Sequence, residues 1–572
     1  MPISADPSDG ATVVGRLAVI LFWVVLAAVG VMHFWSVFTQ NVNWDEFALL
    51  NRAVGTLQSG EILGGGRPGL GTIILVPFAN ACENAVEAIV RARLLWFVMV
   101  VGAAVAFWFL LKTLLPPSRH RWTALALALS VWVLGPVFLR SATQVRTDQP
   151  AILFGLLGGL CLLNSRTRLS WALVAGLSLG IGFLASQKLV YVAALVGVLA
   201  AADLVLRRDW QWRREAWRGA IAAGAFLLVI VGYRIMVGSG AGAPQIVPGA
   251  SQMDAFTFYR ERVGWEEYRH LFPFLTPQLL PLLSVPLLTA AWLREPGRHG
   301  GEIVLAWIVL GLGVAVAIFH AGRFGYFLLT LGLFPAAAVG LVSAPLLDRI
   351  QRFDHRATFL VIVWLPLAAS GLAGAAILTA DTQEHQREAL VFVSRNFPPD
   401  ARGFDATAAF ACRWDPEPFP VRFPRQVWAE FVENDADARG RALLEEFRTR
   451  PVSFMILPRF MAFYPEEVRD FWQTRYVEYY GPILVPGREI RGAEGWTGSF
   501  EVVVPGEYIW RSGGSDAGVL QVGAELVKPG ETVVLTDREV WDLRLPEGGA
   551  GTLVLALRDP PSPGDVPFYV GS

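Results

Sequence analysis

Long apolar runs recur along the first two thirds of the chain and are separated by short polar segments. A membrane-spanning helix needs about 17 to 25 predominantly apolar residues. The first run is too long for the apolar part of a signal peptide and precedes no small-residue cleavage site, which favours an uncleaved anchor. We predict about eleven membrane helices, over residues 14–38, 89–113, 121–139, 149–163, 170–186, 189–206, 217–237, 271–293, 302–319, 324–346 and 357–379.

Lysine and arginine concentrate in every second polar segment. Positively charged loops stay on the cytoplasmic side of a membrane, so we place these segments and the N-terminal residues 1–13 in the cytoplasm. An odd number of spans then puts the chain after about residue 380 outside the inner (plasma) membrane, in the periplasm or its equivalent. The basic segments are residues 112–121, 166–168, 207–218, 294–298 and 349–356.

The last third of the chain has a different pattern, with more charge and proline and no run long enough to cross a membrane. Residues 381–497 predict an α/β region, and residues 498–572 alternate between short strands and glycine turns, as a small β-sandwich requires. This sandwich either binds carbohydrate or packs against the outer loops. The predicted helices are 386–396, 439–448 and 465–476, and the predicted strands are 452–457, 481–485, 499–504, 506–511, 519–522, 532–535, 540–545 and 552–556.

Composition supports this architecture. Of the 572 residues, 54% are hydrophobic and only 17% are charged, whereas about a quarter of residues are charged in soluble proteins. The fold class is therefore a polytopic α-helical membrane protein, with a transmembrane domain over residues 14–380 and a C-terminal extracytoplasmic α/β plus β-sandwich region. The three cysteines have no metal-ligand spacing. Cys82 and Cys412 can form a disulfide if both face an oxidising compartment.

Candidate chemistry begins in the first outer loop, residues 39–88. Asp45 and Glu46 directly follow the first apolar run, and carboxylates beside hydrocarbon are costly enough to indicate function. Apolar positions recur at helical spacing over residues 43–58, which predicts a short amphipathic helix on the membrane surface. Arg67 then follows three glycines, which alone indicate no more than a linker. Residues 70–78 are apolar but too short to span, so they are interfacial or re-entrant.

Three more outer segments carry charge. Arg146 and Asp148 precede the fourth span, where Asp148 is also a plausible helix cap. Lys188 lies between the fifth and sixth spans, where it either acts chemically or extends its ammonium to the membrane surface. His320, Arg323 and Tyr326 open the tenth span. Cations at a helix start oppose the helix dipole, which favours an anionic ligand there.

The third outer loop, residues 238–270, is long and carries aromatic side chains interleaved with charges. Aromatic faces suit sugar rings. An amphipathic helix anchored at the membrane interface explains the same pattern.

This arrangement resembles the GT-C membrane glycosyltransferases, in the branch that contains the protein O-mannosyltransferases and the aminoarabinose transferases that modify lipid A. The resemblance covers roughly residues 14–380 and rests on order, spacing and common sidedness. Relatives often have His-Pro where this chain has Arg67-Pro68, which leaves the role of Arg67 open. The matching elements are Asp45-Glu46, Arg67-Pro68, Arg146-x-Asp148, Lys188, and His320 with Arg323 and Tyr326 before Pro335.

The resemblance implies an enzyme that takes a sugar from a polyprenyl-phosphate donor and transfers it to an extracytoplasmic lipid, glycan or protein acceptor. Asp45 would be the general base, and Glu46 would orient it or contact the acceptor. Cations would surround the donor phosphate. The resemblance implies no particular cofactor, and since family members differ in metal use, a divalent cation at Asp45 is compatible with it. The expected phosphate ligands are Lys188, Arg323, Arg146 and Arg67, with Asp148, His320 and Tyr326 in support.

Two other classes of protein fit parts of the pattern. A lipid or sugar transporter accounts for the many spans, but it predicts broken helices near the midplane and internal repeats, whereas the charges here gather on one side. A nonenzymatic envelope scaffold with a carbohydrate-binding outer domain would not need Asp45. The sequence carries no nucleic-acid signature.

Overall fold

The computed structural model forms two compact units. The first, here called the helical unit, comprises residues 1–40, 55–80 and 89–382, and the second, the C-terminal unit, comprises residues 41–54, 81–88 and 383–572. The structure describes residues 7–62, 69–80, 84–207, 211–237, 279–296, 299–319, 327–350, 353–380, 382–398, 401–405, 436–456, 464–481, 483–512, 518–536 and 538–558.

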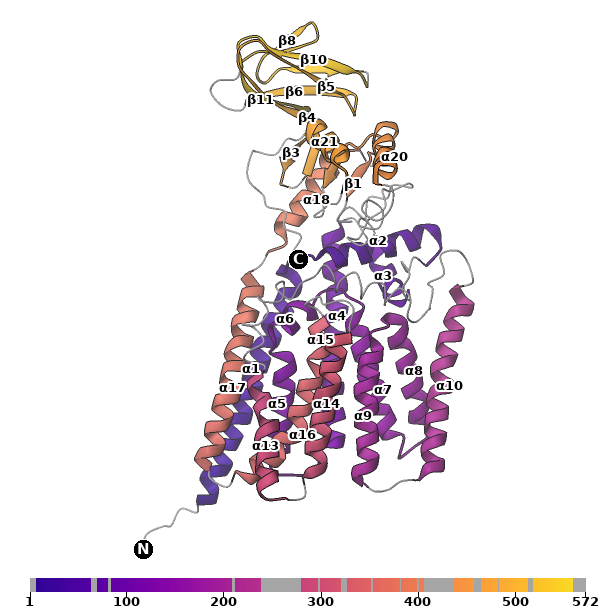
Figure 1. Cartoon of the computed structure of the whole chain (residues 1–572), viewed down its shortest axis with the longest axis vertical. Helices are drawn as coiled ribbons and strands as arrows, with labels where there is room; N and C mark the ends of the chain where they lie inside the picture. The colour runs from indigo at the N-terminus through magenta and orange to yellow at the C-terminus, as the bar shows by residue number, and fades with distance from the viewer. Residues whose placement is uncertain are drawn as a thin grey trace. The chain divides into compact units, whose positions relative to one another are not determined.

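The helical unit is a bundle whose long helices run side by side (Figure 1). Helices α2 (Trp44–Ser59) and α4 are each divided between the two units: residues 44–54 and 85–88 belong to the C-terminal unit, and the rest of both helices belongs to the helical unit. The helices of the bundle are α1 (Pro7–Thr39), α3 (Leu70–Asn80), α4 (Ala85–Leu114), α5 (Arg121–Val133), α6 (Pro136–Ala142), α7 (Asp148–Asn164), α8 (Ser170–Ala185), α9 (Leu189–Arg207), α10 (Trp212–Val237), η2 (Leu280–Leu283), α13 (Ser284–Arg294), α14 (Gly300–Phe319), α15 (Leu328–Leu331), α16 (Leu333–Arg349) and α17 (Phe353–Ala380).

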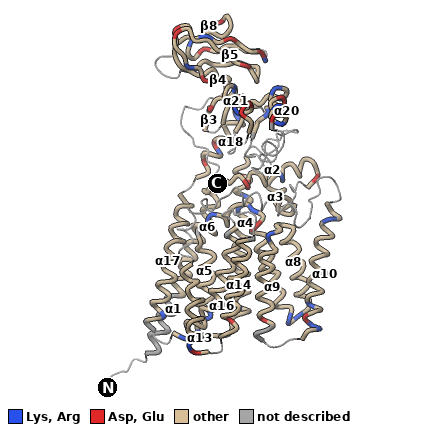
Figure 2. Tube along the Cα trace, viewed as in Figure 1, with Lys and Arg blue, Asp and Glu red and all other residues tan. Residues whose placement is uncertain are grey.

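Six helical segments among the described residues are long and apolar enough to cross a membrane, and they lie in α1, α4, α10, α14, the α15–α16 pair and α17. Six further apolar helices are shorter. Figure 2 shows that charged residues of the helical unit gather near the helix ends, while the middle stretches are almost entirely uncharged. The protein is therefore a multi-pass helical membrane protein.

The predicted third span, residues 121–139, is wrong as a single helix. Helix α5 ends at Val133 and α6 begins at Pro136, because Gly135 adopts an extended backbone with ψ of 133°. Proline has no N–H to donate to the preceding turn and disfavours helical backbone in the residue before it. The break shortens the segment and lets the chain turn into residues 140–148, which carry part of the candidate site.

Glycines set the packing of α7. A Cβ at Gly155 would lie 2.7 Å from Val192 Cγ1, and one at Gly159 would lie 2.6 Å from Val196 Cγ2, both on α9. Small residues four apart let two membrane helices approach closely. A Cβ at Gly158 would likewise meet Leu179 of α8 at 2.8 Å. Helices α7, α8 and α9 are therefore closely packed, and this packing brings the first turns of α7 and α9 together.

The C-terminal unit begins with three helices and a small sheet. The helices are α18 (Glu384–Asn396), α20 (Ala436–Thr449) and α21 (Glu466–Arg475). Strand β1 (Gly403–Asp405) pairs parallel to β2 (Phe454–Ile456), and β2 and β3 (Tyr476–Tyr480) both pair antiparallel to β4 (Ile483–Gly492). Residue 476, predicted as helical, begins β3 instead, because Tyr476 and Val477 are buried in the sheet.

Strand β4 continues into a second region, where its later residues pair with β11 (Gly549–Leu555). Strand β11 pairs with β6 (Gly506–Ser512), which pairs with β9 (Thr532–Leu535). A separate sheet has the order β5 (Trp496–Glu501), β10 (Val540–Leu545), β7 (Leu520–Val522) and β8 (Glu525–Val527). One core joins the two sheets and includes Phe500, Tyr508, Trp510, Leu543 and Leu553. The sequence pattern did not predict β8, which is short and has two exposed residues.

The buried tyrosines of the C-terminal unit predict an alkaline loss of stability. Tyr476 Oη donates to Val452 O at 2.9 Å and Tyr508 Oη donates to Val504 O at 2.7 Å, and burial raises the pKa of both phenols. Because the unfolded chain releases these protons near pH 10 and the folded chain only above it, stability present below about pH 10 falls as the pH rises further.

Tyrosinate absorbance and near-ultraviolet circular dichroism of the full-length protein test this prediction. We expect part of the tyrosine titration to coincide with unfolding, and we expect Tyr508→Phe to move that transition to higher pH. Ordinary titration of every tyrosine near pH 10 with intact tertiary structure would contradict it.

Candidate functional site

Gln40, directly after α1, forms hydrogen bonds with α4, with α6 and with the residue that follows α6. Its Nε2 donates to Arg140 O at 2.9 Å, and its Oε1 accepts from Thr143 Oγ1 at 2.8 Å. Arg93, fully buried on α4, donates from Nη1 to Gln40 O at 2.6 Å. These contacts hold the end of α6 and the residues that follow it, 140–147, against α1 and α4. Sequence reasoning missed Arg93, although a guanidinium inside an apolar run was a visible signal.

Two further buried side chains fix the same segment. Trp96 Nε1 donates to Arg146 O at 2.6 Å. Gln149 Nε2 donates to Ser141 O at 2.7 Å and to Gln144 O at 2.9 Å. Each bond satisfies a carbonyl that would otherwise be buried without a partner. The backbone on either side of Arg146 is therefore held in one conformation.

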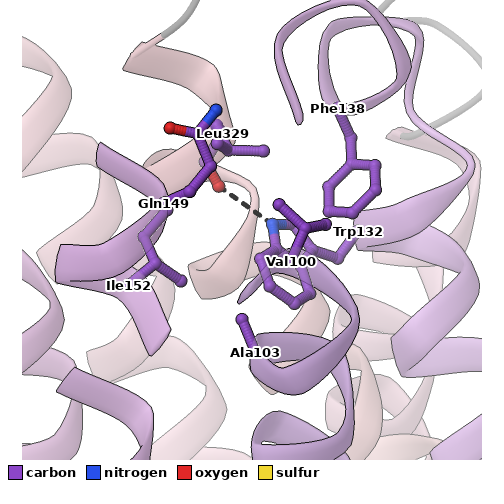
Figure 3. A pocket seen from close by; sticks show the side chains of 7 residues that line it. All are labelled: Val100, Ala103, Trp132, Phe138, Gln149, Ile152 and Leu329. Carbon is purple, nitrogen blue, oxygen red and sulfur yellow. Dashed lines mark hydrogen bonds between the residues drawn. The ribbon is translucent and has the colours of Figure 1, made fainter. Parts of the chain in front are cut away.

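A small cavity lies beside Gln149 (Figure 3). Trp132 Nε1 points across it and donates to Leu329 O at 2.9 Å. Its volume is about 10 Å³, which is space for about one water molecule. This cavity is a packing gap and is too small to admit a substrate. It is lined by Val100, Ala103, Trp132, Phe138, Gln149, Ile152 and Leu329.

The structure brings three of the predicted site residues together. Lys188 Nζ lies 3.1 Å from Asp148 Oδ1 and 3.2 Å from Oδ2, and Arg146 Nε lies 3.9 Å from Asp148 Oδ2. The side chains of Asp148 and Arg146 are 4% and 8% exposed, and that of Lys188 is 24% exposed. Asp148 is therefore paired with cations, and the cation in closest contact is Lys188.

This cluster of Arg146, Asp148 and Lys188 lies where two helices begin. Asp148 is the first residue of α7, and Lys188 directly precedes α9. The first turn of a helix has unsatisfied N–H groups and the positive end of the helix dipole, which is why helix N-termini bind anions. The N-cap of α7 is Thr147, whose side chain makes no cap hydrogen bond, so Asp148 is not the cap that the sequence suggested. The three side chains together carry one net positive charge.

Helix α3 packs beside this cluster. A Cβ at Gly71 would lie 2.7 Å from Thr147 Cγ2, so only glycine permits this approach. The N–H of Gly69 donates to Tyr233 Oη at 2.7 Å, which ties the start of α3 to the end of α10. The predicted short apolar segment is thus an eleven-residue helix, and its first turn lies next to the residue between Arg146 and Asp148.

Asp45 and Glu46 lie in the first turn of α2, in the part of this helix that belongs to the C-terminal unit. Glu46 is fully buried, and its Oε2 accepts from the backbone N–H of Asn43 at 2.8 Å. Asn43 Oδ1 in turn accepts from the N–H of Asp45 at 2.9 Å. This reciprocal pattern is a capping box. The structure therefore gives Glu46 a part in starting the helix that carries Asp45, and the spacing Asn-x-x-Glu was the signal that sequence reasoning overlooked.

The capping box predicts different outcomes for two changes at Glu46. Glutamine also accepts a hydrogen bond from the N-cap N–H, so Glu46→Gln should keep the helix start. Glu46→Ala removes the acceptor and should cost about 1 kcal/mol. Circular dichroism and amide exchange on both variants provide the check. Amide exchange in α2 that rises equally in both variants would contradict the capping role.

Gln386 of α18 fixes the residues that precede α2. Its Oε1 accepts from Val42 N–H at 2.7 Å and its Nε2 donates to Val42 O at 2.9 Å. Gln386 is fully buried. Both backbone groups of Val42 are thereby paired with a side chain 344 positions later in the chain. Asp45 lies three residues after Val42.

Gln386→Leu is expected to release this segment. The change leaves a buried N–H and a buried C=O unpaired, at about 1 to 3 kcal/mol each. Hydrogen–deuterium exchange should rise in peptides that cover residues 41–46, whereas the control Gln473→Leu, at an exposed position on α21, should change nothing there. Equal exchange in all three proteins would show that Gln386 does not hold Val42.

Other predicted site residues lie outside the described residues, namely Arg67, His320, Arg323, Tyr326, Cys82, Cys412 and the loop 238–270. Among the residues that the structure describes, no three His, Cys, Asp or Glu side chains are grouped as a metal ion would require.

No family model matches the sequence, and no curated protein matches it. The structure is similar to that of apo ArnT from Cupriavidus metallidurans, with 14% identity, a TM-score of 0.50, and coverage of 82% of this chain and 97% of that one. ArnT from the same organism bound to undecaprenyl phosphate has 15% identity, a TM-score of 0.46 and coverage of 69% and 84%. The archaeal oligosaccharyltransferase AglB from Archaeoglobus fulgidus, in complex with an inhibitory peptide and a dolichol-phosphate, has 11% identity, a TM-score of 0.41 and coverage of 76% and 69%.

At these identities the similarity concerns the fold alone. The apo ArnT structure supports it best, because the match covers 97% of the ArnT chain. ArnT, an aminoarabinose lipid A transferase, is a GT-C glycosyltransferase. The chain therefore has the GT-C fold, as the resemblance in its sequence predicts.

Proposed function

We propose that this protein is an integral membrane glycosyltransferase that moves a sugar from a polyprenyl-phosphate donor to an extracytoplasmic acceptor. One observation carries the proposal: Lys188 and Arg146 converge on buried Asp148 where α7 and α9 begin. Cationic side chains at helix N-termini suit a phosphate. The GT-C fold supports it, since ArnT of that fold has also been solved with undecaprenyl phosphate.

The donor phosphate is the leaving group of the reaction. When the bond between the sugar C1 and the phosphate oxygen breaks, negative charge develops on that oxygen, and fixed cations stabilise it most strongly in a water-poor site. Lys188 and Arg146 fill this role, and Asp148 orients the Lys188 ammonium. Arg323 and Arg67 are further phosphate ligands on the basis of the sequence resemblance, with His320 and Tyr326 in support.

Asp45 is the general base of the proposed reaction. An acceptor hydroxyl attacks the sugar C1, and its proton passes to the Asp45 carboxylate as the new bond forms. Glu46 supports Asp45 by capping the same helix. A divalent cation at Asp45 is compatible with this chemistry.

The topology in this proposal follows the charge pattern of the loops. About eleven spans cross the inner membrane, the N-terminus is cytoplasmic, and the C-terminal unit is extracytoplasmic. The acceptor is a glycolipid, an envelope polysaccharide or a protein, and the β-sandwich region packs against the outer loops or binds carbohydrate.

Binding of the lipid carrier tests the donor class. Purified full-length protein in detergent is titrated with undecaprenyl phosphate and, in parallel, with uncharged undecaprenol, and native mass spectrometry reports the complexes. The phosphate form should bind and the alcohol should not, and Lys188→Gln combined with Arg146→Gln should reduce the difference. Equal binding of the two lipids to the wild type would refute recognition of the phosphate.

A further inference from the structure

A cationic cleft lies at the other end of α7 from Asp148. It is lined by the last turn of α4, the first residue of α5 and the end of α7, and its volume is about 360 Å³. Helix α7 has 17 residues and is therefore about 25 Å long. The cleft is thus separate from the cluster around Asp148, and nothing in the proposed reaction uses it. Its lining residues are Phe109, Lys112, Thr113, Arg121, Leu160 and Asn164.

Two cations face this cleft without a carboxylate partner. Among the described residues, no Asp or Glu forms an ion pair with Lys112 or Arg121, and Asp348, a nearby carboxylate, is paired with Arg119 at 3.4 Å and His120 at 3.8 Å. Arg121 Nη2 donates to Lys112 O, which holds the two residues together. Its Nε is buried and makes no hydrogen bond within the described chain.

The other walls of the cleft are apolar or neutral. Phe109 and Leu160 supply hydrocarbon surface, and Asn164 supplies an amide. Lys112 Nζ lies 5.5 Å from the centroid of the Phe109 ring and 5.2 Å from that of Trp122. Trp122 is 51% exposed and stacks on Trp108 with centroids 5.8 Å apart. Exposed tryptophans beside lysine are typical of the depth at which lipid headgroups lie.

We propose that this cleft binds an anionic phospholipid. Lys112 and Arg121 hold the phosphate, Asn164 bonds the headgroup, and one acyl chain lies against Phe109 and Leu160. Basic pockets between membrane helices on the cytoplasmic side recognise anionic headgroups in this way, and the loop 112–121 is one of the basic segments that we place in the cytoplasm. The apolar wall distinguishes a lipid from a soluble phosphate, because only the lipid has a chain to cover it.

Lipid competition on the full-length protein tests the proposal. Native mass spectrometry compares binding of phosphatidylglycerol with phosphatidylcholine, for the wild type, for Lys112→Gln/Arg121→Gln, and for Arg168→Gln/Arg213→Gln, which removes two exposed cations outside the cleft. We expect the wild type and the control to prefer the anionic lipid by at least about tenfold, and the cleft variant to lose that preference.

Two additional measurements keep the result decisive. Leu160→Trp leaves both cations in place but fills the cleft, so it should also lose the preference even if the double variant folds poorly. Glycerol 3-phosphate, which has the charge but no acyl chain, should not displace the lipid. Three results would each overturn the lipid site. The first is a preference for the anionic lipid that both cleft variants retain, and the second is an equal loss of that preference in the control variant. The third is full displacement of the lipid by glycerol 3-phosphate.

Discussion

Asp148→Leu should both destabilise the helical unit and abolish sugar transfer. Lys188 Nζ lies 3.1 Å from Asp148 Oδ1, and the Asp148 side chain is only 4% exposed. Removing one partner of a buried ion pair leaves the other charge uncompensated, at about 3 to 5 kcal/mol. The same change frees the Lys188 ammonium from the position that the donor phosphate requires. Thermal unfolding in detergent and donor-dependent transfer in proteoliposomes measure the two effects.

A double variant separates stability from chemistry. Asp148→Leu combined with Lys188→Met removes both charges and replaces the pair with apolar side chains, a substitution that is often neutral for buried ion pairs. Arg146, whose Nε lies 3.9 Å from Asp148 Oδ2, keeps its charge in this variant. We therefore expect the double variant to regain only the part of the thermal stability lost through Lys188, and still to transfer sugar about 10²- to 10³-fold more slowly than the wild type. A transfer rate of the double variant equal to that of the wild type would show that Lys188 does not act on the donor. An unchanged unfolding temperature for Asp148→Leu would show that the pair does not stabilise the bundle.

Asp45→Asn should lower transfer by about 10²- to 10⁴-fold, the range that general base catalysis supplies. Asparagine keeps the size and polarity of the side chain, so the fold and the binding of undecaprenyl phosphate should be unchanged. The measurement is the initial rate of transfer at saturating donor and acceptor. Its control is Glu61→Gln, which removes an exposed carboxylate just after α2 and should leave the rate as it is. A rate for Asp45→Asn within a factor of about two of the wild type would exclude Asp45 as the base.

The long helices were predictable because hydropathy decides them. A continuous apolar run must satisfy its own backbone hydrogen bonds in a bilayer, which leaves little choice besides a helix. Hydropathy averaged over a long window does not detect a short helix break. The prediction therefore joined α5 and α6 across Gly135 and Pro136. The Gly135-Pro136 dipeptide signals this break, because proline disfavours helical backbone in the residue before it.

The sequence singled out Arg146, Asp148 and Lys188 by residue type, but it could not predict their contacts. Asp148 and Lys188 stand 40 positions apart, and their 3.1 Å approach depends on how closely α7 packs on α9 through Gly155 and Gly159. The pairing of Gln386 with Val42 spans 344 positions. A glutamine on an amphipathic helix has no sequence pattern that distinguishes a surface position from a buried bond of this kind. Such contacts follow from tertiary packing alone.

Transfer by the purified protein tests the central claim most directly. Wild-type protein in proteoliposomes is given a panel of radiolabelled polyprenyl-phosphate sugars, with the matching nucleotide sugars as controls, together with envelope acceptors, and Asp45→Asn is assayed at matched protein amounts. We predict that label moves from at least one lipid-linked donor with the wild type, stays in the donor with the variant, and does not move from nucleotide sugars. Label that moves from no lipid-linked donor, or moves equally with both proteins, would contradict the account and favour a transporter or scaffold.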